Sequence, residues 1–184
     1  PGDSIELDSD VLSPFLQATQ QLQLFVGFSP NLNATEHWQY LTAYPYGCLE
    51  QTTRKSRPFS AILNNAGKMS NIGDATEHEV NKKTAGALER YSELQRADGS
   101  FGLWSKTSPE QHWLTAYATD FIWDLKNKGV AVPNVLLKRA TQRLESYLIS
   151  RSSHHVKTWS SNPDHYTAAY RAYAAYVLAK QAKI

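Results

Sequence analysis

Most of the chain follows a helical pattern, in which apolar residues recur every three or four positions. The pattern starts at about Ala34 and predicts six helices joined by short connections. Three of them cover 34–43, 48–66 and 74–95, and the others begin at Ser108, Pro133 and Asn162. Residues 1–33 break the pattern, with short extended pieces in irregular sequence. We therefore expect an all-α stack of antiparallel helices after an irregular or short-stranded N-terminal segment.

Turn and cap residues predict several helix boundaries. Ser108, the proline after it and Gln111 have the spacing of a capped helix start. Gly129 is expected to end that helix, and Pro58 is expected to bend an earlier one because it cannot donate a backbone hydrogen bond. The apolar stripes expected for the last three helices are Trp113, Leu114, Tyr117, Phe121 and Leu125; Leu136, Leu137, Ala140, Leu144, Tyr147 and Leu148; and Tyr166, Ala169, Tyr170, Tyr173, Ala174, Val177 and Leu178.

The composition is that of a globular protein and argues against several classes. Its 184 residues, 41% hydrophobic and 11% aromatic, suit one domain with a real core. The net charge is +2 and no basic run is interleaved with aromatic residues, so no nucleic-acid partner is expected. No apolar stretch approaches the roughly 20 residues that span a bilayer, so no membrane insertion is expected. The spacing of the six histidines does not favour a metal site, and no cofactor is expected.

The single cysteine lies in the segment Gly47-Cys48-Leu49-Glu50-Gln51. If a helix starts at Cys48, its sulfur and the side-chain carbonyl of Gln51 lie on one face, since residues i and i+3 are neighbours. The positive end of the helix dipole favours a thiolate there. Attack of the sulfur on the Gln51 carbonyl, with loss of ammonia, would give an internal thioester, a stored acyl donor. A lone cysteine is also often a small buried hydrophobe, and that interpretation stays open.

The ten residues from Tyr44 to Thr53, with the sequence YPYGCLEQTT, closely resemble the thioester motif of bacterial alpha-2-macroglobulins. Animal macroglobulins and complement proteins carry a Gly-Cys-Gly-Glu-Gln form of it. The resemblance implies that Cys48 and Gln51 are cross-linked as a thioester. It also suggests that Tyr44 and Tyr46 keep water off the bond, although ordinary packing explains Tyr46 equally well.

Residues 95–104 have the Gln…Asp-Gly-Ser…Trp arrangement seen in α/α-toroid proteins, where a glycine turn folds an aromatic over the end of a helical hairpin. A degenerate echo at 157–164 gives the repeat expected of a helical array, although a simple turn explains the loop as well. The thioester domain of the macroglobulin and complement family is such a toroid. The resemblance therefore implies that 34–184 are the N-terminal part of an α/α-toroid thioester domain of a larger protein. Residues 1–33 form the segment before it.

Two further residues are candidate bases. Glu50 lies beside the thioester pair, although a solvated or helix-capping carboxylate explains it as well. In some complement relatives a histidine on a distant loop attacks the thioester, and His165 falls in roughly that later region without a residue-by-residue match. A surface histidine near a helix start is the alternative explanation.

The resemblance implies a single-turnover protease trap rather than an enzyme. In the family a protease cuts a bait region and the molecule rearranges. A lysine amine of the protease then attacks the Gln51 acyl carbon, and Cys48 leaves as a thiol. The expected partners are target proteases and other macroglobulin domains of the parent chain. The family also implies a periplasmic location, with the parent protein lipid-anchored to the inner membrane.

Two other functions remain open. One is an α/α-toroid hydrolase or transferase that uses Cys48 as its nucleophile with a histidine, although no carboxylate pair typical of a glycosidase stands out. The other is a helical interaction module without chemistry, which predicts an unreactive thiol and tolerance of substitution at Gln51.

Overall fold

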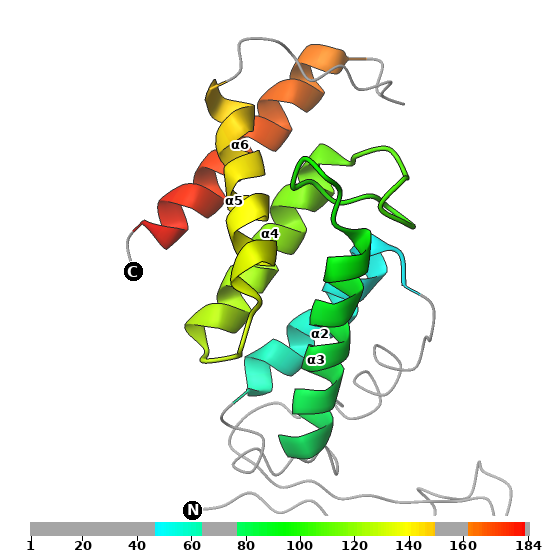
Figure 1. Cartoon of the computed structure of the whole chain (residues 1–184). Coiled ribbons are helices and arrows are strands. Elements are labelled where there is room, and N and C mark those ends of the chain that lie inside the picture. The colour runs from blue at the N-terminus through cyan, green and yellow to red at the C-terminus, as the bar shows by residue number, and fades with distance from the viewer. Residues whose placement is uncertain (1–46, 64–76, 150–161, 183–184) are drawn as a thin grey trace, which may run out of the picture. The chain divides into compact units, whose positions relative to one another are not determined.

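The computed structural model describes residues 47–63, 77–149 and 162–182. Within these ranges it contains α-helices and no β-strand, which confirms the all-α class (Figure 1). The helices are α2 (Leu49–Ile62), α3 (Glu77–Leu94), α4 (His112–Asn127), α5 (Asn134–Ile149) and α6 (Pro163–Gln181). Backbone contacts divide the chain into units 1–33 and 34–184, and every described residue belongs to the second. The helix predicted over 34–43 lies outside the described residues.

Helix α4 is the centre of the described part of the chain. It packs against α2, α5 and α6, while α3 packs on α2 and α5 packs on α6. The chain reverses direction from α2 to α3, from α4 to α5 and from α5 to α6 (Figure 1). The described helices are therefore stacked as antiparallel hairpins, as the short connections predict.

Two clusters of buried apolar side chains hold the helices together. The larger cluster joins α2, α3, α4 and α5 and includes Leu49, Tyr91 and Phe121. The smaller cluster joins α4, α5 and α6 around Tyr147 and Tyr170. A fully buried side chain of this size contributes about 1.5–3 kcal/mol. Because Leu49 is completely buried, the first turn of α2 is anchored in the core.

Glycine and asparagine end and begin helices where the sequence predicts. Gly129 follows α4 with φ +85°, and the Asn162 side chain accepts a hydrogen bond from the His165 N–H at the start of α6. Helix α2 passes through Pro58 and ends at Ile62, so it is shorter than the predicted 48–66.

The predicted helix start at Ser108 is wrong. Helix α4 begins at His112, and the Ser108 hydroxyl instead accepts the backbone N–H groups of Trp104 and Ser105 at 3.3 and 3.1 Å. A serine that is engaged by a preceding loop cannot cap the following helix, which explains the error.

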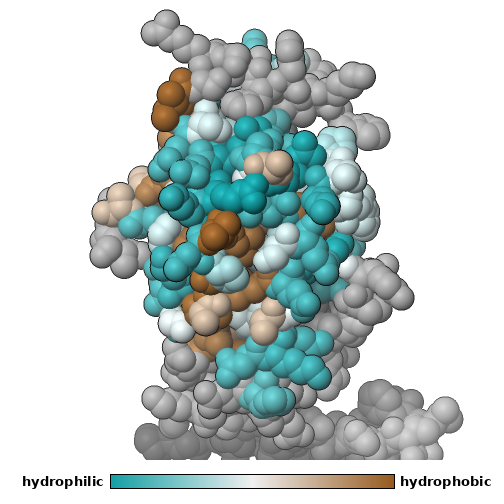
Figure 2. Space-filling model, viewed as in Figure 1, coloured by the Kyte–Doolittle hydropathy of each residue, from teal (hydrophilic) through white to brown (hydrophobic). Residues whose placement is uncertain are grey.

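The predicted apolar stripes are buried or partly buried, except for Trp113, Leu148 and Ala169, which are exposed. On the face shown in Figure 2, hydrophilic side chains surround smaller hydrophobic patches. Among the described helices, none combines the length and the apolar character needed to cross a membrane.

Candidate functional site

The pair of residues singled out by the sequence lies at the start of α2. Cys48 is the N-cap residue, and its sulfur accepts a hydrogen bond from the Gln51 N–H at 3.5 Å. In return, the Cys48 N–H donates to the side-chain oxygen Oε1 of Gln51 at 3.4 Å. This is a capping box in which a thiol replaces the usual hydroxyl. It brings the sulfur and the Gln51 carboxamide together on the first helical turn.

The first turn of α2, called the reactive turn below for its proposed chemistry, is buried on the side of the cysteine. Cys48 is only 7% exposed, whereas Gln51 is partly exposed. The N–H of Leu49 donates to the Leu103 carbonyl at 2.8 Å, which fixes the start of α2 to the loop between α3 and α4. The cysteine is therefore largely shielded from solvent, while the glutamine residue keeps some exposure.

Gly47 is needed directly before the cysteine because of Thr52. A Cβ atom at position 47 would lie 2.5 Å from the Thr52 hydroxyl oxygen, so any larger residue would displace that side chain. The Thr52 N–H donates to the Cys48 carbonyl at 2.9 Å, which is the first helical hydrogen bond of α2. Glycine at position 47 thus lets the backbone pass close to Thr52 as it enters α2.

Arg90 of α3 holds the residue before the cysteine through hydrogen bonds from its side chain. Its Nε and Nη2 atoms donate to the Gly47 carbonyl, each at 3.4 Å, and Nη2 also donates to the Trp104 carbonyl at 2.9 Å. A further ion pair joins Arg90 to Glu93 at 2.6 Å. One guanidinium therefore links α3, the loop after it and the residue preceding Cys48.

The predicted glycine-turn loop forms part of this support. Gly99 has φ +87°, and a Cβ there would lie 2.3 Å from the Arg139 carbonyl oxygen of α5. Glycine is therefore required both for the backbone conformation and for the space. The aromatic that folds back is Phe101, which is fully buried edge-on against Tyr91, whereas Trp104 is 60% exposed. The loop that contacts the reactive turn is thus fixed at its other end to α5.

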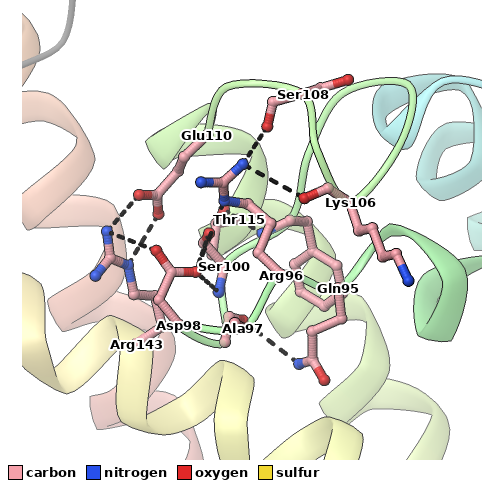
Figure 3. Close-up of polar contacts among 12 residues, drawn as sticks. Gln95, Arg96, Ala97, Asp98, Ser100, Lys106, Ser108, Glu110, Thr115 and Arg143 are labelled. Carbon is pink, nitrogen blue, oxygen red and sulfur yellow. Dashed lines mark hydrogen bonds and ion pairs between the residues drawn. The ribbon is translucent and has the colours of Figure 1, made fainter.

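Charged groups complete the loop's attachment to α5 (Figure 3). Arg143 donates to Glu110 from Nε at 3.1 Å and lies 3.6 Å from Asp98. Burial alone would raise the pKa of Asp98. Hydrogen bonds from Ser100 and the positive charge of Arg143 outweigh this effect and hold the pKa below its usual range.

A second charged cluster holds α2 further along its length. Arg57 donates to Asp120 of α4 at 2.8 Å, and Lys180 of α6 donates to the other oxygen of the same carboxylate at 2.8 Å. Burial lowers the pKa of Lys180, but the hydrogen bonds to Asp120 and Asp124 dominate and raise it to about 12. This cluster ties α2 to α4 and α6 through one buried carboxylate.

The other predicted site residues are not gathered around Cys48 by the described contacts. Glu50 pairs with Arg54 at 3.7 Å on the exposed side of α2. His165 is exposed on the first turn of α6, and no described hydrogen bond, ion pair or ring contact joins it to the reactive turn. The roles of Glu50 and His165 as bases stay predictions, and Tyr44 and Tyr46 lie outside the described residues.

Sequence reasoning missed the supporting residues of the site. The hydrogen bonds donated by Arg90 and Leu49 go to backbone carbonyls about 14 to 54 positions away along the chain. A backbone acceptor has no sequence signature. Across the described ranges, no group of three or more metal-ligating side chains comes together.

Three comparisons identify the chain's relatives. The family profile of the A-macroglobulin TED domain matches residues 19–144. Alpha-2-macroglobulin of Escherichia coli is 33% identical over an alignment of 185 positions, which covers the whole chain and 11% of that protein.

Solved structures agree with the sequence matches. The native E. coli protein, crystallised from domain MG7 to the C-terminus, has a TM-score of 0.73 and 32% identity over 83% of this chain and 24% of that one. Salmonella alpha-2-macroglobulin reacted with methylamine has a TM-score of 0.69 and 35% identity over 84% of this chain and 10% of that one. The matched domain is an α/α toroid, which confirms the predicted fold class. The chain spans about a tenth of its E. coli relative and belongs to the A-macroglobulin TED domain family.

Proposed function

We propose that this chain is the thioester-bearing part of a bacterial alpha-2-macroglobulin and that a thioester between Cys48 and Gln51 holds attacking proteases covalently. The reciprocal hydrogen bonds at 3.5 and 3.4 Å carry this proposal. They place a nucleophilic sulfur and the carboxamide it must attack on the same helical turn. Formation of the bond requires local side-chain rotation and no rearrangement of the helices.

The chemistry follows from these two groups. The Cys48 sulfur attacks the Gln51 carbonyl carbon and ammonia leaves, which stores an acyl donor. A lysine amine of the protease later attacks the same carbon. The carbon–sulfur bond breaks, an amide forms, and the proton lost from the amine ends on the thiol. Each molecule acts once, so the protein is an inhibitor and not a catalyst with turnover.

A relative supports an amine-reactive acyl group. The Salmonella alpha-2-macroglobulin described above was crystallised after reaction with methylamine, a small primary amine. Reaction of the same kind at Gln51 is expected here, since Gln51 is partly exposed.

The rest of the mechanism belongs to the complete parent protein. Tyr44 and Tyr46 would shield the bond, and Glu50 or His165 would accept the proton of an incoming nucleophile. Other macroglobulin domains and a bait region would control access to it. We place the parent protein in the periplasm, lipid-anchored to the inner membrane, on the strength of the family.

Trapping is tested on the complete protein with a broad-specificity protease. We expect an adduct that survives denaturing electrophoresis, one thiol released per protease bound, and no adduct with Cys48→Ala. Protease with a blocked active site is the control and should form none. Many substrate molecules turned over per protein would favour the toroid enzyme, and an intact thiol without any adduct would favour the interaction module.

A further inference from the structure

Helix α2 carries a primary amine on the same side as the reactive pair. Lys55 follows Gln51 by four residues and Cys48 by seven, within the continuous helix Leu49–Ile62. Side chains four residues apart are neighbours on a helix, and a glutamate before a lysine is the better orientation for contact. Glutamine has the same side-chain length as glutamate. The reach that lets such a pair form an ion pair therefore lets the Lys55 amine approach the Gln51 acyl carbon.

The electrostatic surroundings of Lys55 lower its pKa and so ease loss of a proton from the amine. Burial lowers the pKa of Lys55 first, and the positive charges of Arg54 on α2 and Lys83 on α3 lower it further. A negative charge on Cys48 acts in the opposite direction and raises the pKa of Lys55. Once the sulfur is acylated it carries no charge, so this opposing influence disappears while the thioester exists.

We propose that Lys55 is an internal acceptor for the acyl group of Gln51, an inference that rests on the proposed thioester. The Lys55 nitrogen attacks the Gln51 carbonyl carbon, the carbon–sulfur bond breaks, and an amide bond forms. The proton lost from the nitrogen ends on the Cys48 sulfur. The product is an isopeptide cross-link within α2 and a free thiol, with no net change in mass from the thioester form.

This reaction competes with water and with external amines for the same acyl group. It is slow in the intact molecule, because the thioester holds the acyl group back toward Cys48 and most lysine is protonated near neutral pH. A thioester that is disturbed when no target protein is present then reacts with Lys55 of the same chain. The cross-linked protein can no longer attach to bystander proteins.

Mass and thiol measurements on the complete protein separate the possible products. The thioester form is lighter than the sequence by one ammonia and has no free thiol. The isopeptide form has that same mass, one free thiol and no reaction with methylamine. The hydrolysed form carries glutamate at position 51 and a free thiol. During incubation without protease or amine, we expect the isopeptide form to accumulate, faster at higher pH, with fragmentation locating the link between Gln51 and Lys55.

Three variants make the test specific. Lys55→Arg keeps the charge and the aliphatic stem but lacks the primary amine, so it should lose the isopeptide form completely and decay by hydrolysis. Lys83→Arg is the matched control and should behave like the natural protein. Cys48→Ala keeps both Gln51 and Lys55 but has no acyl donor, so no cross-link should form.

The outcomes distinguish this inference from the proposed function. Decay of the natural protein to the hydrolysed form alone, or a link to another lysine, overturns the role of Lys55 and leaves the thioester in place. An unmodified mass with a free thiol from the outset overturns the thioester itself. Thermal unfolding of Lys55→Arg, measured alongside, should match that of the natural protein.

Discussion

The two parts of α2 are held in different ways. At the first turn, the Cys48 and Gln51 groups meet at 3.4 to 3.5 Å, the long limit of a hydrogen bond. Two turns further on, Arg57 meets the buried carboxylate of Asp120 at 2.8 Å. The reactive turn is thus fixed by its backbone and by burial of Leu49, while charged side chains hold the middle of the helix. We therefore expect that the Cys48 and Gln51 side chains can change partners without loosening the helix.

The charged cluster consists of short, charge-assisted hydrogen bonds. Burial would lower the pKa of Arg57, but its hydrogen bond to Asp120 overrides this and raises the pKa. Asp120 also accepts from Lys180, so its single side chain joins three helices. Reactivity and stability should therefore respond to different substitutions.

The largest effect is expected at Gln51. Gln51→Asn keeps a carboxamide but shortens it by one methylene, so it cannot meet the Cys48 sulfur at the same turn. Incorporation of methylamine should be lost completely and the thiol should be free from the start, as measured by mass spectrometry and thiol titration. The free energy of unfolding should fall by less than about 1 kcal/mol, the typical cost of a weakened cap. Gln142→Asn on the exposed side of α5 is the matched control.

Asp120→Asn should have the opposite effects, with a large loss of stability and little change in amine reactivity. Removing this charge leaves Arg57 and Lys180 facing one another with less compensation. We expect a cost of about 2–3 kcal/mol, less than for breaking a fully buried pair, because both cations are partly exposed. Chemical denaturation measures the change, with Asp164→Asn as an exposed control. Loss of amine reactivity at temperatures where the variant is folded would contradict the separation of the two regions.

Arg90→Ala should change both the stability and the amine reactivity moderately. The variant loses the hydrogen bonds to the carbonyls of Gly47 and Trp104, a change of about 1 kcal/mol, which corresponds to roughly fivefold faster reaction with methylamine if access limits the rate. Arg90→Lys should recover part of the effect, since an ammonium cannot span both carbonyls as a guanidinium does.

The control for Arg90 is Arg54→Ala, which removes an exposed arginine from the reactive helix itself. Equal rates of methylamine reaction in Arg90→Ala and the natural protein would show that the hydrogen bonds of Arg90 do not govern access to the acyl group. Equal acceleration in both variants would assign the effect to loss of positive charge.

The smallest effect concerns Asp98 in the supporting loop. Its pKa is lower in the folded state than the ordinary value of 3.8, so its contribution to stability is present above that value and is lost as the pH falls through the folded pKa. Because the side chain is 40% exposed, the contribution should stay below about 1 kcal/mol. Denaturation curves of Asp98→Asn should differ from the natural protein at neutral pH and converge in acid. A constant difference at every pH would contradict this origin.

Local spacing explains what could be predicted from the sequence. The i and i+3 positions of Cys48 and Gln51, and the glycine before them, are features of one helical turn and can be read without knowing the fold. The toroid loop was recognisable for the same reason, since Asp98 and Gly99 form a local turn with Ser100. The sequence therefore indicated the fold and the neighbouring positions of the two residues that are proposed to react.

Long-range contacts explain what was missed. Arg90 meets backbone carbonyls of segments brought together only by the packing of α2, α3 and the following loop. Ser108 satisfies the sequence rule for a cap but is taken up by its own loop, which moved the start of α4 to His112. At Arg90 the contacts depend on tertiary packing, whereas at Ser108 hydrogen bonds within the loop replace the expected helix cap.

The most direct measurement is the intact mass of the gently purified complete protein before and after methylamine, with a thiol count at each step. The account predicts a starting mass one ammonia below the sequence and no free thiol, followed by methylamine at Gln51 and release of the Cys48 thiol. A full mass with a free thiol in the untreated protein, and no methylamine at Gln51 afterwards, would contradict it.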